Sequence, residues 1–191
     1  MAHPLTIAIP GRRYHGAMPV TIRLVTRDDV PALVDLMRAN RDFLAPWEPS
    51  RTDEFFTAEY QDTAIATALK QYEMGTVMPQ LILDDGEIVG RITLNNIVRG
   101  PLQSAKLGSW VASAANGRGV ASAAVAAIIP IAFEELGLHR IAAATLLHNI
   151  RSQRVLERNG FVRFGVAPRY LQIAGKYQDH ALYQRLADDP A

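Results

Sequence analysis

Cysteine is absent from this chain of 191 residues, and aromatic residues make up only 7% of it. Without cysteine the protein forms no disulfide bond, thiolate metal site or iron–sulfur cluster, and it has no cysteine nucleophile. We expect no metal ion at its functional site. The lack of cysteine is consistent with a protein of the cytoplasm, which is the location we expect.

An excess of either charge is also missing. The 20 Lys and Arg residues are balanced by 19 Asp and Glu residues, so the formal net charge is +1. This balance argues against binding of nucleic acid through bulk positive charge and against an acidic disordered tail. Hydrophobic residues (49%) and charged residues (20%) stand at the levels of an ordinary globular protein. We therefore expect no direct nucleic-acid partner.

Long hydrophobic runs are missing as well. The longest, residues 120–133, contains Pro130 and is shorter than the roughly 18 apolar residues that a membrane span needs. Residues 1–19 lack the pattern of a signal peptide. Their prolines and glycines predict an extended or disordered lead-in, and Met18 is a second candidate start. We expect no membrane contact and one folded domain over residues 20–191, a length that buries roughly 70% of the unfolded surface.

Apolar periodicity and turn residues predict alternating strands and helices. Thr26 and Asp29 have the spacing of a capping box, and Asp85-Gly86 is typical of a hairpin turn. Pro130 lies inside a predicted helix, where it favours a kink or an early end. The predicted strands are 20–25, 81–83, 88–94, 105–113, 140–146, 161–166 and 178–186; the predicted helices end near residue 40, span 57–74, run to about 136 and span 149–158; a loop is expected at 43–51. This order predicts an α/β (α+β) fold with a central mixed sheet and helices on both faces.

A glycine-rich segment joins a predicted strand to a predicted helix and reads Asn116-Gly117-Arg118-Gly119-Val120-Ala121. Glycines let a ligand approach the backbone closely. The first N–H groups of the helix have no internal partner, and with the helix dipole they favour an anion such as phosphate or pyrophosphate. Arg118 adds positive charge. A tight turn without a ligand is the alternative, since the segment matches neither the dinucleotide fingerprint nor the Walker pattern.

A second polar segment follows the next strand. Asn149 and Ser152 are three residues apart at the start of a short predicted helix, so they share one helix face. The simpler interpretation is that Asn149 is an N-cap and Ser152 an early polar residue of the helix. The other interpretation makes both part of a ligand site.

In this order the two segments resemble the GNAT N-acetyltransferases, which use acetyl-coenzyme A. The loop of that family reads Gln/Arg-x-x-Gly-x-Gly/Ala, and Asn116 stands here at its first position. Residues 146–161 are similar to the family's Asn-x-x-Ser…Gly-Phe block, and the resemblance covers about residues 20–186. Within the family the chain resembles the RimJ/RimL-type ribosomal-protein-alanine N-acetyltransferases, in residues 40–49, 96–100, 138–141 and 170–180.

The resemblance implies a GNAT fold with acetyl-CoA as cosubstrate. The pantetheine arm would lie against the strand at Trp110 and Val111, and Asn149 would hold it. The pyrophosphate would sit on the backbone amides of residues 117–121. Ser152 would lie near the thioester sulfur. Because the usual tyrosine acid of the family is not at its position, Ser152 is the candidate to protonate the leaving thiolate, directly or through water.

The implied reaction is direct attack of a neutral amine on the acetyl carbonyl. An α-amino group has a pKa of about 7.7–8, so a water chain could replace a dedicated base. Glu48, beside Trp47, is the first candidate base; alternatively it only positions the amine or a loop. Asp179 and His180 are weaker candidates, and His180 is better explained as a strand histidine satisfied by the fold. Trp47 either walls the acceptor pocket or belongs to the core, and the core is favoured.

The predicted function is transfer of acetyl from acetyl-CoA to the N-terminal α-amino group of a protein or peptide, such as a ribosomal protein that begins with alanine or serine. One alternative is an acetyltransferase for a small amine, such as an antibiotic or a polyamine; an anionic cleft would favour the polyamine. Another is an inactive acetyl-CoA-binding module, against which Asn149 and Ser152 argue. Both a monomer and a homodimer fit the sequence.

Overall fold

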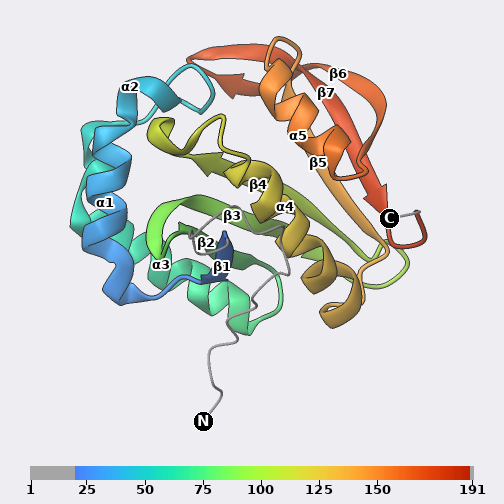
Figure 1. Ribbon diagram of the computed structural model, residues 1–191, viewed down its shortest axis with the longest axis horizontal. Helices are drawn as coiled ribbons and strands as arrows, with labels where there is room; N and C mark the ends of the chain where they lie inside the picture. Colours follow the sequence, from blue (N-terminus) through green and yellow to red (C-terminus); the bar gives the residue numbers. More distant parts are fainter. Residues whose placement is uncertain (1–19, 190–191) are drawn as a thin grey trace.

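The computed structural model describes residues 20–189, which contribute a seven-stranded sheet in the order β1-β2-β3-β4-β5-β7-β6 (Figure 1). The predicted lead-in at residues 1–19 lies outside the described residues. Among those described, no helix is long and apolar enough to span a membrane. The strands are β1 (Thr21–Leu24), β2 (Met78–Asp84), β3 (Glu87–Val98), β4 (Ser104–Val111), β5 (Arg140–Leu146), β6 (Val162–Ile173) and β7 (Lys176–Leu186), and the helices are α1 (Val30–Ala39), α2 (Arg41–Leu44), α3 (Ala58–Glu73), α4 (Val120–Pro130) and α5 (Ile150–Arg158).

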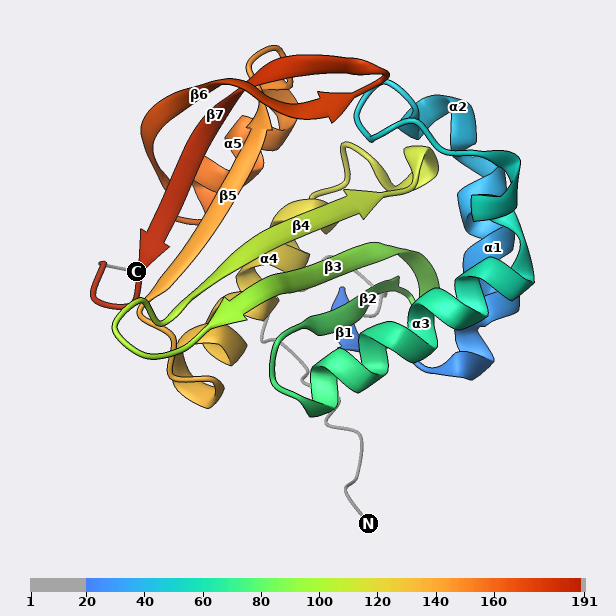
Figure 2. The same ribbon diagram turned by 180° about the vertical axis from the view of Figure 1, so that it is seen from behind.

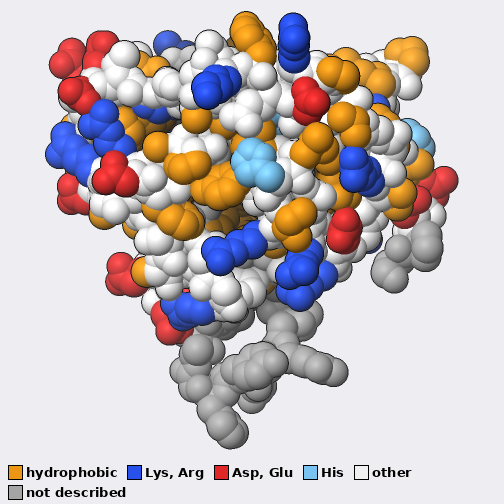
Figure 3. All heavy atoms as spheres, turned by 90° about the horizontal axis from the view of Figure 1, so that it is seen from above, with side chains coloured by type: hydrophobic (Ala, Val, Ile, Leu, Met, Phe, Trp, Pro, Cys, Tyr) orange, Lys and Arg blue, Asp and Glu red, His pale blue; other side chains and the backbone are white. Residues whose placement is uncertain are grey.

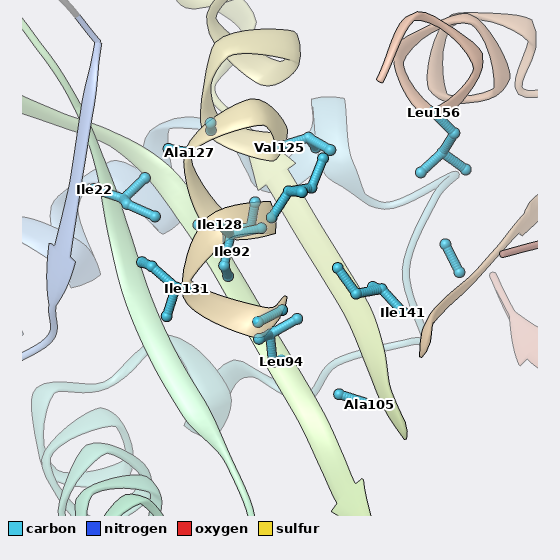
Figure 4. Close-up of a cluster of buried hydrophobic side chains, with 14 of the residues drawn as sticks. Ile22, Ile92, Leu94, Ala105, Val125, Ala127, Ile128, Ile131, Ile141 and Leu156 are labelled. Carbon is cyan, nitrogen blue, oxygen red and sulfur yellow. The ribbon is translucent and has the colours of Figure 1, made fainter. Parts of the chain in front are cut away.

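Helices cover both faces of the sheet, as predicted. Figure 2 shows α3 and α1 against the half of the sheet that contains β2 and β3, while α4 and α5 lie on the opposite face. Each layer has its own buried apolar cluster. The larger one lies between α4 and the sheet and includes Ile92, Leu94, Val125, Ile128 and Ile141 (Figure 4). The smaller one joins α1, α3 and β2 through Leu33, Ile65 and Leu81.

Helix ends follow the sequence signals closely. Thr26 and Asp29 form the predicted capping box ahead of α1. The α-helical part of α4 ends at Pro130, and a π-helical turn, Ile131–Glu135, follows it. Because proline has no N–H and its ring crowds the preceding turn, the regular hydrogen-bond ladder cannot continue through it. The regular α-helix therefore ends early, as predicted, while helical turns of the π type continue to Glu135, close to the predicted end near residue 136.

The centre of the sheet opens toward one end. Among the described strands, β4 and β5 are the parallel pair, and they are paired only from Ser104–Arg140 to Leu107–Ala143. Beyond these four positions the two strands diverge, as Figure 2 shows. The loop after β4 leads into α4, and the loop after β5 leads into α5. The N-termini of both helices therefore lie at the opening.

Two segments differ from the prediction. The first residues of the expected loop at 43–51 form the end of α2. A hydrogen bond from the Leu44 N–H to the Asn40 carbonyl, 2.9 Å, joins α2 to the end of α1. Strands β6 and β7 extend beyond the predicted 161–166 and 178–186 and form a long hairpin. Pro168 concealed the extension, because proline cannot donate to a strand ladder. An irregularity in register between Ala167 and Leu171 accommodates it.

Candidate active site

The glycine-rich loop precedes α4 at the opening of the sheet. Gly117 and Gly119 have φ angles of 76° and 84°, and Gly119 is the N-cap of α4. A Cβ added at either glycine would meet no atom within 4 Å, so the space in front of the loop is open. The first N–H groups of α4 have no acceptor inside the helix. The loop has the backbone features of an anion site, and binding of pyrophosphate there stays a prediction.

Two side chains of this loop are engaged with the protein itself. The Arg118 guanidinium forms an ion pair with Asp84 at the end of β2, 2.9 Å. The Asn116 amide donates to the Ala112 carbonyl, 3.0 Å, and so ties the loop to the end of β4. The contribution of residues 116–121 to anion binding therefore depends chiefly on their backbone amides.

A cavity of about 410 Å³ adjoins the loop, and we call it the cofactor cavity. It brings together six of the predicted cofactor residues: Trp110 and Val111 from β4, Asn116 and Ala121 from the loop and α4, and Asn149 and Ser152 from α5. The other four, Gly117, Arg118, Gly119 and Val120, belong to the connecting loop and the first residue of α4 and do not line the cavity. Its position between the diverging strands suits an extended ligand arm.

The start of α5 presents Asn149, Arg151 and Ser152 to the cofactor cavity. The Asn149 side-chain oxygen accepts the Ser152 backbone N–H, 3.1 Å, so Asn149 is an N-cap, as the simpler interpretation predicts. The cap leaves the Asn149 amide nitrogen available as a donor. The Ser152 hydroxyl is half-buried and has no hydrogen-bond partner among residues 20–189. It is therefore available to a ligand.

A second cavity, of about 620 Å³, lies against α1, α2 and β3, and we call it the acceptor cavity. The two cavities share Leu44, Ser109 and Trp110, so they meet at β4. Figure 3, which looks on to the uppermost face of Figure 1, shows a hollow with apolar side chains around it, and basic and acidic side chains mixed on the side of α1 and α2. A ligand in each cavity would contact the other at this shared wall.

Glu48 lines the acceptor cavity. Burial raises the pKa of its carboxyl above the ordinary value, and the positive charges of Arg51 and Arg91 offset part of that rise. Its carboxylate has no direct ion pair or hydrogen bond with another described residue. Its backbone carbonyl accepts the Ala174 N–H, 3.0 Å, which joins this loop to the β6–β7 hairpin. The backbone of Glu48 is thus fixed and its carboxylate has no direct partner, as a general base or a binding site for an ammonium group requires.

The core assignment favoured for Trp47 is wrong. Its side chain is 38% exposed, lines the cofactor cavity and packs against the His148 ring, with 5.6 Å between ring centroids. The turn after α2 carries Trp47 to the edge of the cofactor cavity, where its side chain stays partly exposed.

The weaker base candidates lie elsewhere. His180 is 3% exposed, and its Nδ1 lies 2.9 Å from the Gln178 carbonyl oxygen, so it is the satisfied strand histidine that was predicted. Asp179 accepts the Arg169 N–H, 2.9 Å, in the β6–β7 hairpin. Neither side chain lines either of the two cavities.

Sequence reasoning missed the arginines of the acceptor cavity, Arg41, Arg51 and Arg91. A signal for Arg91 is present, because Ile92 and Leu94 alternate with polar residues along β3. That alternation predicts a polar face, but only the packing of α2 and its following loop turns the face into a cavity wall.

Comparison with known proteins identifies the family. Residues 20–162 match the model of the acetyltransferase (GNAT) domain. The chain is 32% identical over 165 residues to ribosomal protein uS5-alanine N-acetyltransferase of Escherichia coli (strain K12), with 85% of each chain covered. It is similar to the structure of ribosomal-protein-S5-alanine acetyltransferase from Vibrio fischeri (30% identity, TM-score 0.87, 97% of this chain and 98% of that chain). It is also similar to Mycobacterium smegmatis RimJ in complex with CoA-disulfide (32% identity, TM-score 0.86, 91% and 87%).

The fold and the family match define an acetyltransferase. The chain belongs to the GNAT acetyltransferase family. It is an N-acetyltransferase that uses acetyl-CoA as its acetyl donor.

Proposed function

We propose that this enzyme acetylates the N-terminal α-amino group of a protein, of the ribosomal-protein-alanine type. The observation that carries the proposal is the junction of two cavities at Ser109 and Trp110, with Ser152 in one and Glu48 in the other. The alanine-specific relatives from Escherichia coli and Vibrio fischeri supply the acceptor class. Such an acceptor implies action in the cytoplasm, on protein rather than nucleic acid or membrane. The enzyme would act as a monomer or a homodimer.

Glu48 and Ser152 divide the proton transfers between them. Acetyl-CoA supplies the acetyl group as a thioester. The amine nitrogen forms the new bond to the carbonyl carbon, and the carbon–sulfur bond breaks. Glu48, directly or through water, accepts the proton that the amine loses, and the Ser152 hydroxyl, directly or through water, donates a proton to the thiolate. Ser152 then regains a proton from solvent as Glu48 releases one, so the protons balance. A desolvated carboxylate with a raised pKa is a stronger base than an exposed one, which suits an amine whose pKa is about 8.

The acceptor cavity argues against a polyamine. Arg41, Arg51 and Arg91 line it together with a single carboxylate, that of Glu48. Arg41 is neutralised by its ion pair with Asp53, 2.7 Å, but the other two arginines would repel a polycation. The unengaged Ser152 hydroxyl argues against an inactive binding module.

A panel of acceptors tests the proposal. We expect acetyl-CoA-dependent thiol release with peptides that have a free N-terminal alanine. The same peptide with a blocked N-terminus and an internal lysine should react at least about a hundredfold more slowly, since lysine has a pKa near 10.4 and is almost fully protonated at pH 7.5. Mass spectrometry locates the acetyl group. Faster reaction of spermidine or of the blocked peptide would contradict the proposal.

A further inference from the structure

The acceptor cavity holds a cation whose charge is left without a direct partner. Arg91 projects into it from the middle of β3, half-buried, and its guanidinium makes no hydrogen bond or direct ion pair with the described residues. Burial lowers its pKa, and the charge of Glu48 acts on it only from beyond ion-pair distance. A desolvated guanidinium with unused N–H donors is unfavourable unless an anion reaches it.

Other arginines of the described chain show what is missing. Arg23, Arg27, Arg41 and Arg118 each form an ion pair with an aspartate, at 2.5–2.9 Å. Arg91 has no such aspartate, although its burial makes an ionic partner more valuable. An anion of a bound molecule would supply the ionic partner that Arg91 lacks.

A second arginine stands at the same cavity. The Arg51 guanidinium lies over the Phe55 ring, 4.3 Å from its centroid, and lines the cavity without a direct ion pair. Stacking on an aromatic face orients a guanidinium and leaves its edge free to bind an anion. The cavity therefore presents two unpaired guanidinium groups and the carboxylate of Glu48.

Register places Arg91 close to the reaction. It is the partner of Trp110 in the antiparallel β3–β4 pairing, and Trp110 belongs to the wall that both cavities share. An anion held by Arg91 would thus lie within a few residues of the reacting amine along an acceptor chain.

We propose that Arg91, assisted by Arg51, binds a carboxylate of the acceptor while Glu48 faces its amine, so that the enzyme selects N-termini with Asp or Glu among their first three residues. This inference rests on the proposed function. The planar guanidinium fits a carboxylate through two parallel hydrogen bonds, which a lysine ammonium does not reproduce.

Paired peptides test the inference. Two hexapeptides begin with alanine and differ only by Glu or Gln at the second position, and a second pair differs at the third. In one pair or the other, the wild-type enzyme should show a KM about tenfold lower for the Glu peptide. Arg91→Gln should remove this preference, so that the Glu and Gln peptides have equal KM values, and should leave the KM of acetyl-CoA unchanged. Arg91→Lys should restore only part of the preference. Arg158→Gln, at the exposed end of α5, is the control and should keep it all.

The outcomes separate this inference from the proposed function. Acetylation of Glu and Gln peptides with equal KM in both pairs, or an equal loss for both in Arg91→Gln, would overturn acidic selection and leave the proposed function standing. If no peptide is acetylated, the proposed function fails. The acetylation rates of L-alanine, which has a free carboxylate, and L-alaninamide, which has none, are then compared. Faster acetylation of L-alanine that depends on Arg91 would support carboxylate binding alone, and equal rates would overturn it.

Discussion

Ionisation of the Glu48 carboxyl favours catalysis but lowers the stability of the folded protein. Its carboxylate faces the acceptor cavity without a direct partner, and burial raises its pKa above 4.5 while two arginines partly oppose that rise. The same desolvation that makes it a better base also makes the folded state less tolerant of its charge. Activity and stability should therefore respond to its removal in opposite directions.

Glu48→Gln keeps the shape and removes the charge. We expect kcat/KM for a peptide amine to fall by about 10²–10⁴-fold at pH 7, the usual contribution of a general base. The part of the acidic limb that belongs to the Glu48 carboxyl should disappear, and the rate should recover at high pH, where the amine is already neutral. A rise in KM without a change in profile shape would assign Glu48 to positioning only. Glu73→Gln, at an exposed site of α3, should match wild type.

Stability gives this prediction an independent readout. Because the pKa of Glu48 is raised in the folded state, wild type is less stable than Glu48→Gln at pH values above that pKa. The difference should vanish as the pH falls below 4.5, where the carboxyl is protonated in both folded and unfolded protein. Urea unfolding at pH 8 and pH 4 measures it.

Ser152 and Asn149 can be separated although they share a hydrogen bond. The cap uses the Ser152 backbone N–H, so Ser152→Ala leaves it intact. We expect Ser152→Ala to lower kcat by about 10²-fold with little change in acetyl-CoA affinity or thermal stability. Asn149→Ala should lower the free energy of unfolding by about 1 kcal/mol. Loss of affinity in Ser152→Ala with kcat intact would make Ser152 a binding residue.

Single residues show where sequence reasoning succeeds and where it stops. Helix spacing predicted that Asn149 and Ser152 share one face, the family resemblance made them site candidates, and both line the cofactor cavity. Arg91 was missed and Trp47 was misassigned because both depend on where α2 and its loop pack. That packing joins segments far apart in the sequence, such as Trp47 and His148, and no local pattern encodes it.

At the scale of an element, the N-terminus of α4 is the clearest test of anion binding. Gly119 has a positive φ and open space around it, and Gly137, after the π-helical turn, has the same two properties (φ +61°). A side chain at either position costs about 1–2 kcal/mol of backbone strain. The same substitution at Gly119 and Gly137 should therefore cost similar stability, so Gly137 serves as the control for Gly119.

Gly119→Glu should abolish stabilisation by acetyl-CoA, because it places a carboxylate in front of the N–H groups that we expect to hold the pyrophosphate. Gly137→Glu should lose similar stability and still bind. Thermal-shift titration of both variants measures the difference. Equal stabilisation of both by acetyl-CoA would remove the loop from the pyrophosphate site.

Elements were predicted well where the signal is local. The end of α4 at Pro130 and the capping box ahead of α1 follow from steric and hydrogen-bonding rules that act within one turn. The length of the β6–β7 hairpin does not, since pairing between the strands overrides the interruption at Pro168.

At the scale of the whole molecule, Asp29 links folding to pH. It is 8% exposed and accepts hydrogen bonds from Arg23, at 2.6 and 2.8 Å, and from Thr26. These contacts, chiefly the pair with Arg23, lower its pKa to about 2 from 3.8. The carboxylate therefore stabilises the fold at pH values above 3.8, and this contribution is lost as the pH falls toward 2.

Asp29→Asn should lower the free energy of unfolding by about 1–2 kcal/mol at pH 7, after allowance for solvent screening of the pair. The difference from wild type should shrink as the pH falls from 3.8 toward 2. Asp28→Asn, at the exposed neighbouring position, should differ little from wild type at any pH. A loss that does not change with pH would show that Asp29 acts through shape rather than charge.

The class of fold was predictable from the order of its elements, but the strand order was not. Alternating strands and helices favour a mixed sheet with two helical layers, and the sheet has both. Which strands become neighbours depends on long-range pairing. The early divergence of β4 and β5, which creates the cofactor cavity, has no counterpart in the sequence of either strand.

Because the β4–β5 ladder is short, the sheet consists of two half-sheets joined at only a few paired positions. Strands β1–β4 form one half and β5, β7 and β6 the other, and four paired positions connect them. A donor molecule held between the diverging strand ends would add to the contacts that the ladder and the core cluster beneath α4 make between the halves. Binding and cooperativity are then linked, because a ligand of the native state stabilises only the joined form. We expect the loaded enzyme to unfold in a sharper transition than the free enzyme.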